Sequence, residues 1–339
     1  MSMSRYREVV VASVVLLLAA APVAAADNVM ELAKKEGKVV WYSSLSLPIA
    51  QEVCNAYNAK KTGIECVLHR SGSGKLYTRW RNEAKAGIYE ADVLHTSNIG
   101  HFVSLEKAKA IIQYAPKGIE KYNRNFVEKE HYWEVLRASV YTPAYNTADV
   151  KETDAPKTWQ DLLDPKWKGK LVQAHPGYSG FVSVGLAGLV KVFGWEYIDK
   201  LAQQKPRIVQ SAVDTTAYIV RGEALAGATG LYNDFDPIKN GEHIKAIYPP
   251  TGVPFIASPE AIFAKAPHPN AAKVFTDWLF STEAQQILVN HGLYSGDPEV
   301  KYPKGLTPLK EIKLITVSPQ ESVDMRDPVQ KRFREKFGV

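Results

Sequence analysis

Two runs of alternating strand-like and helix-like segments constrain the fold of this chain more than any other feature. Residues 39–42 read Val-Val-Trp-Tyr, which is typical of a buried strand, and apolar side chains in 49–60 recur at helical spacing. We predict strands over 38–43, 64–69 and 91–94, and helices over 49–60 and 76–85. Because strands alternate with helices, we expect an α/β domain with a mainly parallel sheet.

The segment 135–145 interrupts this alternation. It is a long extended run that contains Pro143, and we predict that it crosses from one domain to another. A second α/β unit follows, with one of its strands expected over 226–232. The segments 252–257 and 261–263 are expected to return the chain to the first domain.

The predicted organisation is two lobes with a hinge and an interlobe cleft. The first lobe is discontinuous, over 27–140 plus 256–339, and the second lobe spans 141–255. A length of 339 residues suits two domains. In open α/β sheets a ligand binds at the carboxyl ends of the strands, so we expect it in the cleft, with hinge closure around it.

The N-terminus has the features of a secretory signal peptide. Arg5 and Arg7 precede an apolar run over 9–18, and an Ala-rich segment ends at Ala26. A basic start, a short apolar core and small residues at a cleavage site predict that 1–26 are removed on export. An uncleaved membrane anchor is the alternative. With cleavage we expect a periplasmic protein that does not span the membrane, since no later segment is apolar and long enough.

Composition and charge limit the classes of partner that we expect. The chain is 45% hydrophobic and 23% charged, as globular proteins are, and its formal net charge is +6. The basic residues are scattered and form no nucleic-acid motif, so we expect no nucleic-acid partner. Two cysteines are present, Cys54 and Cys66. They form either a disulfide, which an oxidising compartment allows, or two separate buried thiols.

Several segments resemble bacterial family 1 extracellular solute-binding proteins. The most specific is Trp159-Gln-Asp-Leu-Leu-Asp-Pro-Lys-Trp-Lys-Gly. The other matching segments are Lys38-Val-Val-Trp-Tyr-Ser-Ser, His69-Arg-Ser-Gly-Ser-Gly-Lys, Ala91-Asp-Val-Leu-His-Thr-Ser, Tyr145-Asn-Thr, His175-Pro-Gly-Tyr-Ser-Gly, His268-Pro-Asn-Ala-Ala-Lys and Ser281-Thr-Glu-Ala-Gln.

The chain is most similar to the branch that holds the ferric-ion-binding proteins and their relatives, which bind phosphonates, sugar phosphates, thiamine and other small organic ions. The resemblance implies a two-lobed periplasmic-binding-protein fold. It also implies a monomeric substrate-binding component of an ABC importer, whose partners are a small ligand and a permease in the inner membrane.

Ser- and Gly-rich loops before helices suggest that the ligand is a small organic anion, such as a carboxylate, phosphonate or phosphate ester. The loops are 71–74, 176–182 and 211–216, and free backbone N–H groups at a helix start bind anions. Arg70 and Lys75 would add charge. The alternative for each loop is ordinary turn and capping chemistry. The predicted ligand-binding residues are Ser43, Ser44, Arg70, Ser71, Ser73, Gly74, Ser97, Tyr145, Tyr178, Ser179, Gly180, Thr215, Tyr232 and Asp234.

Ferric iron is the alternative ligand. The resemblance implies tyrosinate ligands, including an adjacent Tyr pair, because phenolate oxygen is a hard donor that suits a hard cation. Tyr42, Tyr145 and Tyr232 would then bind the metal, but 230–234 holds only one tyrosine. We therefore favour no metal site and no cofactor, with ferric ion retained as a second candidate for the transported ligand.

Other functions have less support. Ser179 does not lie in a Gly-x-Ser-x-Gly nucleophile elbow, and Asp92 and His95 form no triad with a placed nucleophile, so we predict that the protein is not an enzyme. His95 and His175 are expected to be structural. Asp234 is also open to a second interpretation, as a turn residue after the strand over 226–232. A sensor that presents its ligand to a membrane receptor is a weaker alternative to transport.

Overall fold

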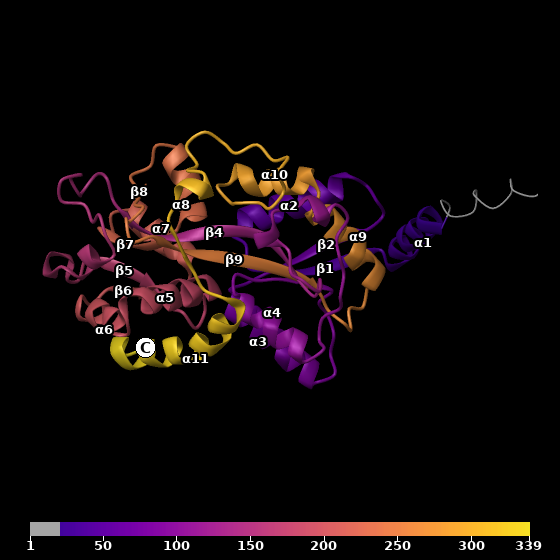
Figure 1. Ribbon diagram of the computed structural model, residues 1–339, viewed down its shortest axis with the longest axis horizontal. Helices are drawn as coiled ribbons and strands as arrows, with labels where there is room; N and C mark the ends of the chain where they lie inside the picture. The colour runs from indigo at the N-terminus through magenta and orange to yellow at the C-terminus, as the bar shows by residue number, and fades with distance from the viewer. Residues whose placement is uncertain (1–20) are drawn as a thin grey trace, which may run out of the picture.

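The computed structural model describes residues 21–339, which form a layered α/β molecule (Figure 1). Most of the predicted signal peptide, residues 1–20, lies outside the described residues. Helix α1 (Ala21–Glu36) begins before the predicted cleavage point at Ala26. The signal peptide therefore stays a prediction.

Ten strands within residues 21–339 form one sheet. Its order is β2-β1-β3-β9-β4-β7-β5-β6, with β10 beside β9 and β8 beside β4. The strands are β1 (Lys38–Ser43), β2 (Glu65–Arg70), β3 (Val93–His95), β4 (Glu134–Tyr145), β5 (Leu171–Ala174), β6 (Arg207–Val209), β7 (Ala226–Gly230), β8 (Lys245–Ala246), β9 (Val253–Ile262) and β10 (Leu314–Thr316).

The long strands β4 and β9 join the two halves of the sheet, and both run through the middle of the molecule in Figure 1. Residues 134–140 of β4 pair with β9, whereas residues 141–145 pair with β7. We call the half on β1, β2, β3, β9 and β10 the first lobe, and the half on β5 to β8 the second lobe. The change of partner falls at Tyr141, which we propose as the first lobe boundary.

The sheet is mixed rather than mainly parallel. Inside the lobes the expected parallel pairing is present, between β1 and both β2 and β3, and between β5 and both β6 and β7. The crossing strands β4 and β9 run antiparallel to each other. This direction is required, because one strand leaves the first lobe and the other returns to it.

Helices cover both faces of the sheet. In the first lobe α2 packs on β2 and α9 on β1, whereas α3 and α4 lie on the other side (Figure 1). The helices after α1 are α2 (Leu47–Ala59), α3 (Ser73–Lys85), α4 (Ile99–Lys107), α5 (Gly180–Phe193), α6 (Glu196–Gln203), α7 (Ala212–Val220), α8 (Leu231–Lys239), α9 (Pro269–Leu279), α10 (Thr282–Asn290) and α11 (Pro319–Phe337). Short 3₁₀ turns occupy Ile119–Lys121, Arg124–Phe126, Gln160–Leu163, Pro165–Trp167 and Leu309–Glu311.

Helix α11 contacts both lobes, although the sequence analysis assigns all of 256–339 to the first. It packs against α4 in the first lobe and against α5 and α6 in the second, along the lower edge of Figure 1. Arg332 forms an ion pair with Asp199 on α6, and Phe333 packs edge-on against His175, with ring centres 5.1 Å apart. The last helix therefore bridges the lobes.

Helix α5 fills the core of the second lobe, where residues 180–190 are all buried. Within residues 21–339 no single helix has the length and apolar character to cross a bilayer. Helices α5 and α6 together meet the length and composition criteria, but they are bent by 112° relative to each other.

A disulfide joins Cys54 on α2 to Cys66 on β2, which resolves the alternative left open by the sequence. The two Cα atoms are 5.4 Å apart, within the usual range for a disulfide. The bond fixes α2 against the strand that follows it. This attachment matters for the site, because residues just before α2 and at its start face the cleft.

Replacing both cysteines by alanine is expected to lower the free energy of unfolding. A disulfide that closes a loop of about 15 residues restricts the unfolded chain by about 3 kcal/mol, and the sequence separation here is 12. Urea unfolding of the Cys54→Ala/Cys66→Ala variant measures the loss. Dithiothreitol should destabilise the wild type by a similar amount and leave the variant unchanged; equal stability of oxidised wild type and variant would contradict the prediction.

Candidate functional site

Three helix N-termini, from both lobes, meet at one cavity of about 110 Å³. Helix α3 follows Gly72 in the first lobe, and α5 and α7 follow Ser179 and Ser211 in the second. The first N–H groups of a helix lack intrahelical acceptors, and the helix dipole makes that end positive, so each end attracts anions. The cavity is lined by Ser44, Arg70, Ser71, Gly72, Ser73, Lys75, Ser97, Tyr178, Ser179, Phe181, Gln210, Ser211, Ala212, Val213 and Tyr232.

Arg137 on β4 lies beside this cavity and is fully buried. Its Nη2 donates a hydrogen bond to Ser97 Oγ at 3.0 Å, and its guanidinium is 5.0 Å from the centre of the Tyr232 ring. Its Nε and Nη1 have no partner among residues 21–339. Burial lowers the pKa of Arg137 to about 10, so the group is charged at neutral pH.

Serines link Arg137 to the cavity wall. The Ser97 N–H donates to Ser73 Oγ at 3.2 Å, and the hydroxyls of Ser97 and Ser44 are 3.3 Å apart. Ser97 follows β3, Ser44 follows β1 and Ser73 opens α3. Parallel strands end at the same edge of a sheet, so the βα loops bring these hydroxyls together around the charge.

Two further cations line the cavity. Arg70 Nε donates to the Leu45 carbonyl at 2.8 Å, which holds the side chain along the cleft. Lys75 Nζ lies 5.3 Å from the centre of the Tyr178 ring and donates to Gln210 Oε1 at 3.2 Å, across the lobes. Among the described residues, no Asp or Glu lines this cavity. The wall is therefore cationic and rich in hydrogen-bond donors.

The structure brings many of the predicted site residues to this wall: Ser44, Arg70, Ser71, Ser73, Ser97, Tyr178, Ser179 and Tyr232. Gly74 and Gly180 lie next to it, where backbone or side-chain atoms of the other lobe are in contact. The other predicted residues lie behind the wall or away from it.

Ser43, Thr215 and Asp234 are buried supports. Ser43 Oγ is 3.1 Å from His95 Nδ1, and burial, followed by the charge of Arg137, lowers the pKa of His95 well below its ordinary value. Thr215 Oγ1 donates to the Ala212 carbonyl at 2.6 Å. Burial raises the pKa of Asp234 to about 7, while hydrogen bonds from two threonine hydroxyls oppose the rise.

The three tyrosines of the ferric alternative do not meet at one point. Tyr232 lines the cavity, but Tyr145 ends β4, opposite β7 and β8. Tyr42 donates to Glu83 at 3.0 Å, and burial, followed by Glu83, raises its pKa, which opposes the tyrosinate form. Within the described part of the chain, no group of three or more His, Cys, Asp or Glu residues has the arrangement to hold a metal ion.

Arg137 is not among the predicted site residues, and Tyr232 lies on a helix rather than on the predicted strand. The predicted strand over 226–232 ends at Gly230, and α8 begins at Leu231, so Tyr232 and Asp234 are helical rather than strand and turn residues. Gly230 caps this helix without a side-chain hydrogen bond, and Pro237 lies inside it. Apart from Asp234 in the first turn, the helix start therefore carries few of the usual sequence signals.

Residues 91–308 match the model of the family described as bacterial extracellular solute-binding protein. The chain belongs to that family. Members serve as the periplasmic substrate-binding components of ABC transporters, which confirms the role inferred from the sequence resemblance.

Relatives of this solute-binding protein carry different ligand names. It is 26% identical over 270 residues to the Fe(3+)-binding periplasmic protein of Serratia marcescens, covering 75% of this chain and 77% of the relative. The fold matches AfuA of Actinobacillus pleuropneumoniae, solved with fructose-6-phosphate, at TM-score 0.82 and 20% identity, covering 89% and 99% of the two chains. Iron-bound HitA of Pseudomonas aeruginosa matches at TM-score 0.76 and 21% identity, covering 88% and 99%. The two-lobed fold is thereby confirmed.

Glycines allow the lobes of this solute-binding protein to touch beside the cavity. A Cβ atom at Gly72 would lie 2.5 Å from the Tyr178 carbonyl oxygen, and one at Gly74 would lie 2.5 Å from the Gly177 carbonyl oxygen. Both contacts join the first lobe to the second. Backbone atoms cannot give way as a flexible side chain can, so any larger residue would hold the lobes apart.

Gly74→Ala is expected to open the cleft without unfolding the protein. Alanine is favoured over glycine inside a helix by up to about 1 kcal/mol, so α3 itself should tolerate the change. Small-angle scattering of the ligand-free protein should show a larger radius of gyration than the wild type. Asn82→Ala, on the exposed side of α3, is the matched control; an unchanged radius for both variants would refute the steric argument.

His291 forms a second tie between the lobes. Its Nδ1 is 2.7 Å from Asp236 Oδ2 on α8 and its Nε2 is 2.8 Å from Glu52 Oε2 on α2. Donating to both carboxylates requires both ring N–H groups, which only the imidazolium has. The hydrogen bonds to Asp236 and Glu52 raise the pKa of His291 against the opposing effect of burial.

The stabilisation from His291 is expected to fall as pH rises. The pKa of His291 is higher in the folded than in the unfolded state. Its contribution to the free energy of unfolding is therefore complete below the unfolded pKa of about 6.5, and it is lost as the pH rises through the folded pKa. The free energy of unfolding should exceed that of His291→Gln by on the order of 1 kcal/mol or less at pH 6, and the difference should shrink by pH 9. A pH-independent difference in chemical denaturation would count against the charged tie.

Proposed function

We propose that this periplasmic solute-binding protein captures a small organic anion, namely a carboxylate, phosphonate or phosphate ester. The observation that carries the proposal is the buried guanidinium of Arg137, which has two unpartnered nitrogens beside a cavity whose described lining holds no acidic residue. A buried charge without a counterion is costly, and a ligand carboxylate or phosphate group would supply the missing partner.

The two lobes supply complementary halves of such a site. The first lobe contributes Arg70, Lys75 and the start of α3, and the second contributes the starts of α5 and α7. An anion in the cavity interacts with both lobes only when they are closed, so binding shifts the open–closed equilibrium toward the closed form. The closed form would then dock on the permease.

Two relatives support an anionic cargo through their names. AfuA was solved with a sugar phosphate, and a putative 2-aminoethylphosphonate-binding periplasmic protein of Salmonella typhimurium is 26% identical over 157 residues, covering 42% of this chain and 44% of the relative. Iron-binding relatives support the ferric alternative instead. We favour the anion, because the three candidate tyrosines do not meet at one cavity and the pKa of Tyr42 is raised.

Export through the N-terminal signal peptide, a monomeric state and a role without catalysis belong to the same proposal. The basic, then apolar, then Ala-rich start supports export. Membership of a family of transport components supports binding without turnover.

Isothermal titration of the ligand-stripped protein with phosphate, phosphonate and carboxylate compounds tests the proposal. At least one anion should bind, and Arg137→Met should weaken it by about tenfold or more, since a hydrogen bond to a charged group contributes about 1.5–3 kcal/mol. The ligand-free stability of Arg137→Met should be equal to or higher than that of the wild type, because the variant removes an uncompensated buried charge. Arg81→Met, on exposed α3 surface, is the control.

A structural role for Arg137 predicts the opposite pattern, with lost stability and unchanged affinity. Binding of ferric ion with a visible tyrosinate colour, and of no organic anion, would overturn the proposal.

A further inference from the structure

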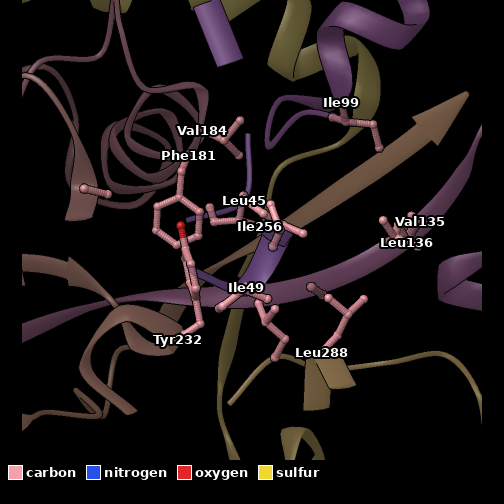
Figure 2. Close-up of a cluster of buried hydrophobic side chains, with 14 of the residues drawn as sticks. Leu45, Ile49, Ile99, Val135, Leu136, Phe181, Val184, Tyr232, Ile256 and Leu288 are labelled. Carbon is pink, nitrogen blue, oxygen red and sulfur yellow. The ribbon is translucent and has the colours of Figure 1, made fainter. Parts of the chain in front are cut away.

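A second chamber of about 390 Å³ opens beside the serine-lined cavity. Val213 and Tyr232 line both spaces, so the second chamber continues the first on the other side of these two residues. Figure 2 shows Tyr232 between Phe181, which lines the serine-lined cavity, and Ile49, which lines the second chamber. We call the serine-lined cavity the inner cavity and the second chamber the outer chamber.

The outer chamber is also formed by both lobes. Its first-lobe wall is Ser46, Pro48 and Ile49, just before and at the start of α2. Its second-lobe wall comes from α7 and α8. A group inside it would therefore contact both lobes in the closed form, as an anion in the inner cavity would.

The chemistry of the two spaces differs. The inner cavity presents serines and cations, whereas the wall of the outer chamber is mostly apolar. Its apolar lining residues are Pro48, Ile49, Val213, Ala217, Val220 and Pro237.

Three polar side chains of the outer chamber have partners, whereas Asn233 Nδ2 is buried without one among the described residues. Thr216 Oγ1 donates to Asp234 at 2.6 Å, and Arg221 Nε donates to Glu223 at 2.6 Å. Asp236 accepts from His291. Thr216, Arg221 and Asp236 therefore compete weakly for a ligand. Asn233 offers it one hydrogen-bond donor, and apolar contact is the larger part of what the wall offers.

We propose that the ligand has two parts: an anionic head in the inner cavity and an apolar body, either a branched or linear alkyl chain or an aromatic ring, in the outer chamber. The inference rests on the proposed function, because it places the anionic head at Arg137. Selectivity among anions then comes from the body, since a bare anion leaves the outer chamber without an apolar partner. Burial of the body between the lobes adds to the closure that the head begins.

Two matched series of ligands test the inference. Methyl-, propyl-, butyl- and phenylphosphonate form one series, and acetate, butanoate, pentanoate and benzoate form the other. In the series whose head group binds, affinity for the wild type should rise about fourfold for each added methylene until the chamber is filled. Titration calorimetry should also show a heat capacity of binding that becomes more negative with body size.

Variants of α7 test whether the gain in affinity from a longer body arises in the outer chamber. Ala217→Trp fills the outer chamber and should abolish the gain from a longer body while leaving methylphosphonate or acetate affinity unchanged. Val220→Asn makes the wall polar without filling it and should reduce the gain per methylene. Val192→Trp, on the exposed side of α5, is the control for a new tryptophan.

The outcomes separate the two proposals. If the smallest anion binds and longer bodies give no gain, or if the gain persists in both α7 variants, the two-part ligand is wrong and the anion proposal stands. If no member of either series binds but a phosphate ester does, the two-part ligand is wrong and the anion proposal stands. If no organic anion binds, both proposals fail. A gain that is lost in Ala217→Trp and retained in Val192→Trp supports the inference.

Discussion

The buried charge of Arg137 is the constraint on which the site depends. Transferring a guanidinium from water into a protein interior costs several kcal/mol, and here one hydrogen bond to Ser97 and the nearby Tyr232 ring offset only part of that cost. The charge is held by β4, the strand that pairs with both lobes. An anion bound at the proposed site would therefore interact with the strand that joins the two halves of the sheet.

The βα architecture explains why donors surround that charge. Strands β2, β5 and β6 lead into α3, α5 and α7, so both lobes direct positive helix ends at the same cavity. Glycines at 72 and 74 let the backbones touch without side chains between them. Neither lobe holds the whole of the proposed site, and this division would couple ligand binding to closure.

The sequence predicts the local parts of this arrangement well and the non-local parts poorly. Strand periodicity identifies β1 and β2, and the Ser-Gly loops with Arg70 identify five of the eight predicted residues at the cavity, because both signals are local. The other three, Ser44, Ser97 and Tyr232, lie outside those loops. Arg137 is not predicted from the sequence, because a single arginine within an extended segment resembles a surface charge. Only the packing of both lobes around it makes it buried. The bridging helix α11 is not predicted either. Its sequence is highly charged and contains Pro328, and its apolar face has few residues, including Val329 and Phe333. Whether Tyr42, Tyr145 and Tyr232 meet at one point depends on the direction of the strands that carry or precede them, and no local sequence pattern encodes that direction.

The bridging helix α11 affects how well a transporter could distinguish the ligand-bound protein from the ligand-free protein. Because α11 contacts α4 and also α5 and α6, part of the free energy of closure is available without cargo. A larger closed fraction raises the apparent affinity, since less binding energy is spent on selecting the competent state. It would also let empty carriers occupy the proposed permease partner and compete with loaded ones. The packing of one terminal helix thus sets a compromise between scavenging at low concentration and wasted docking events.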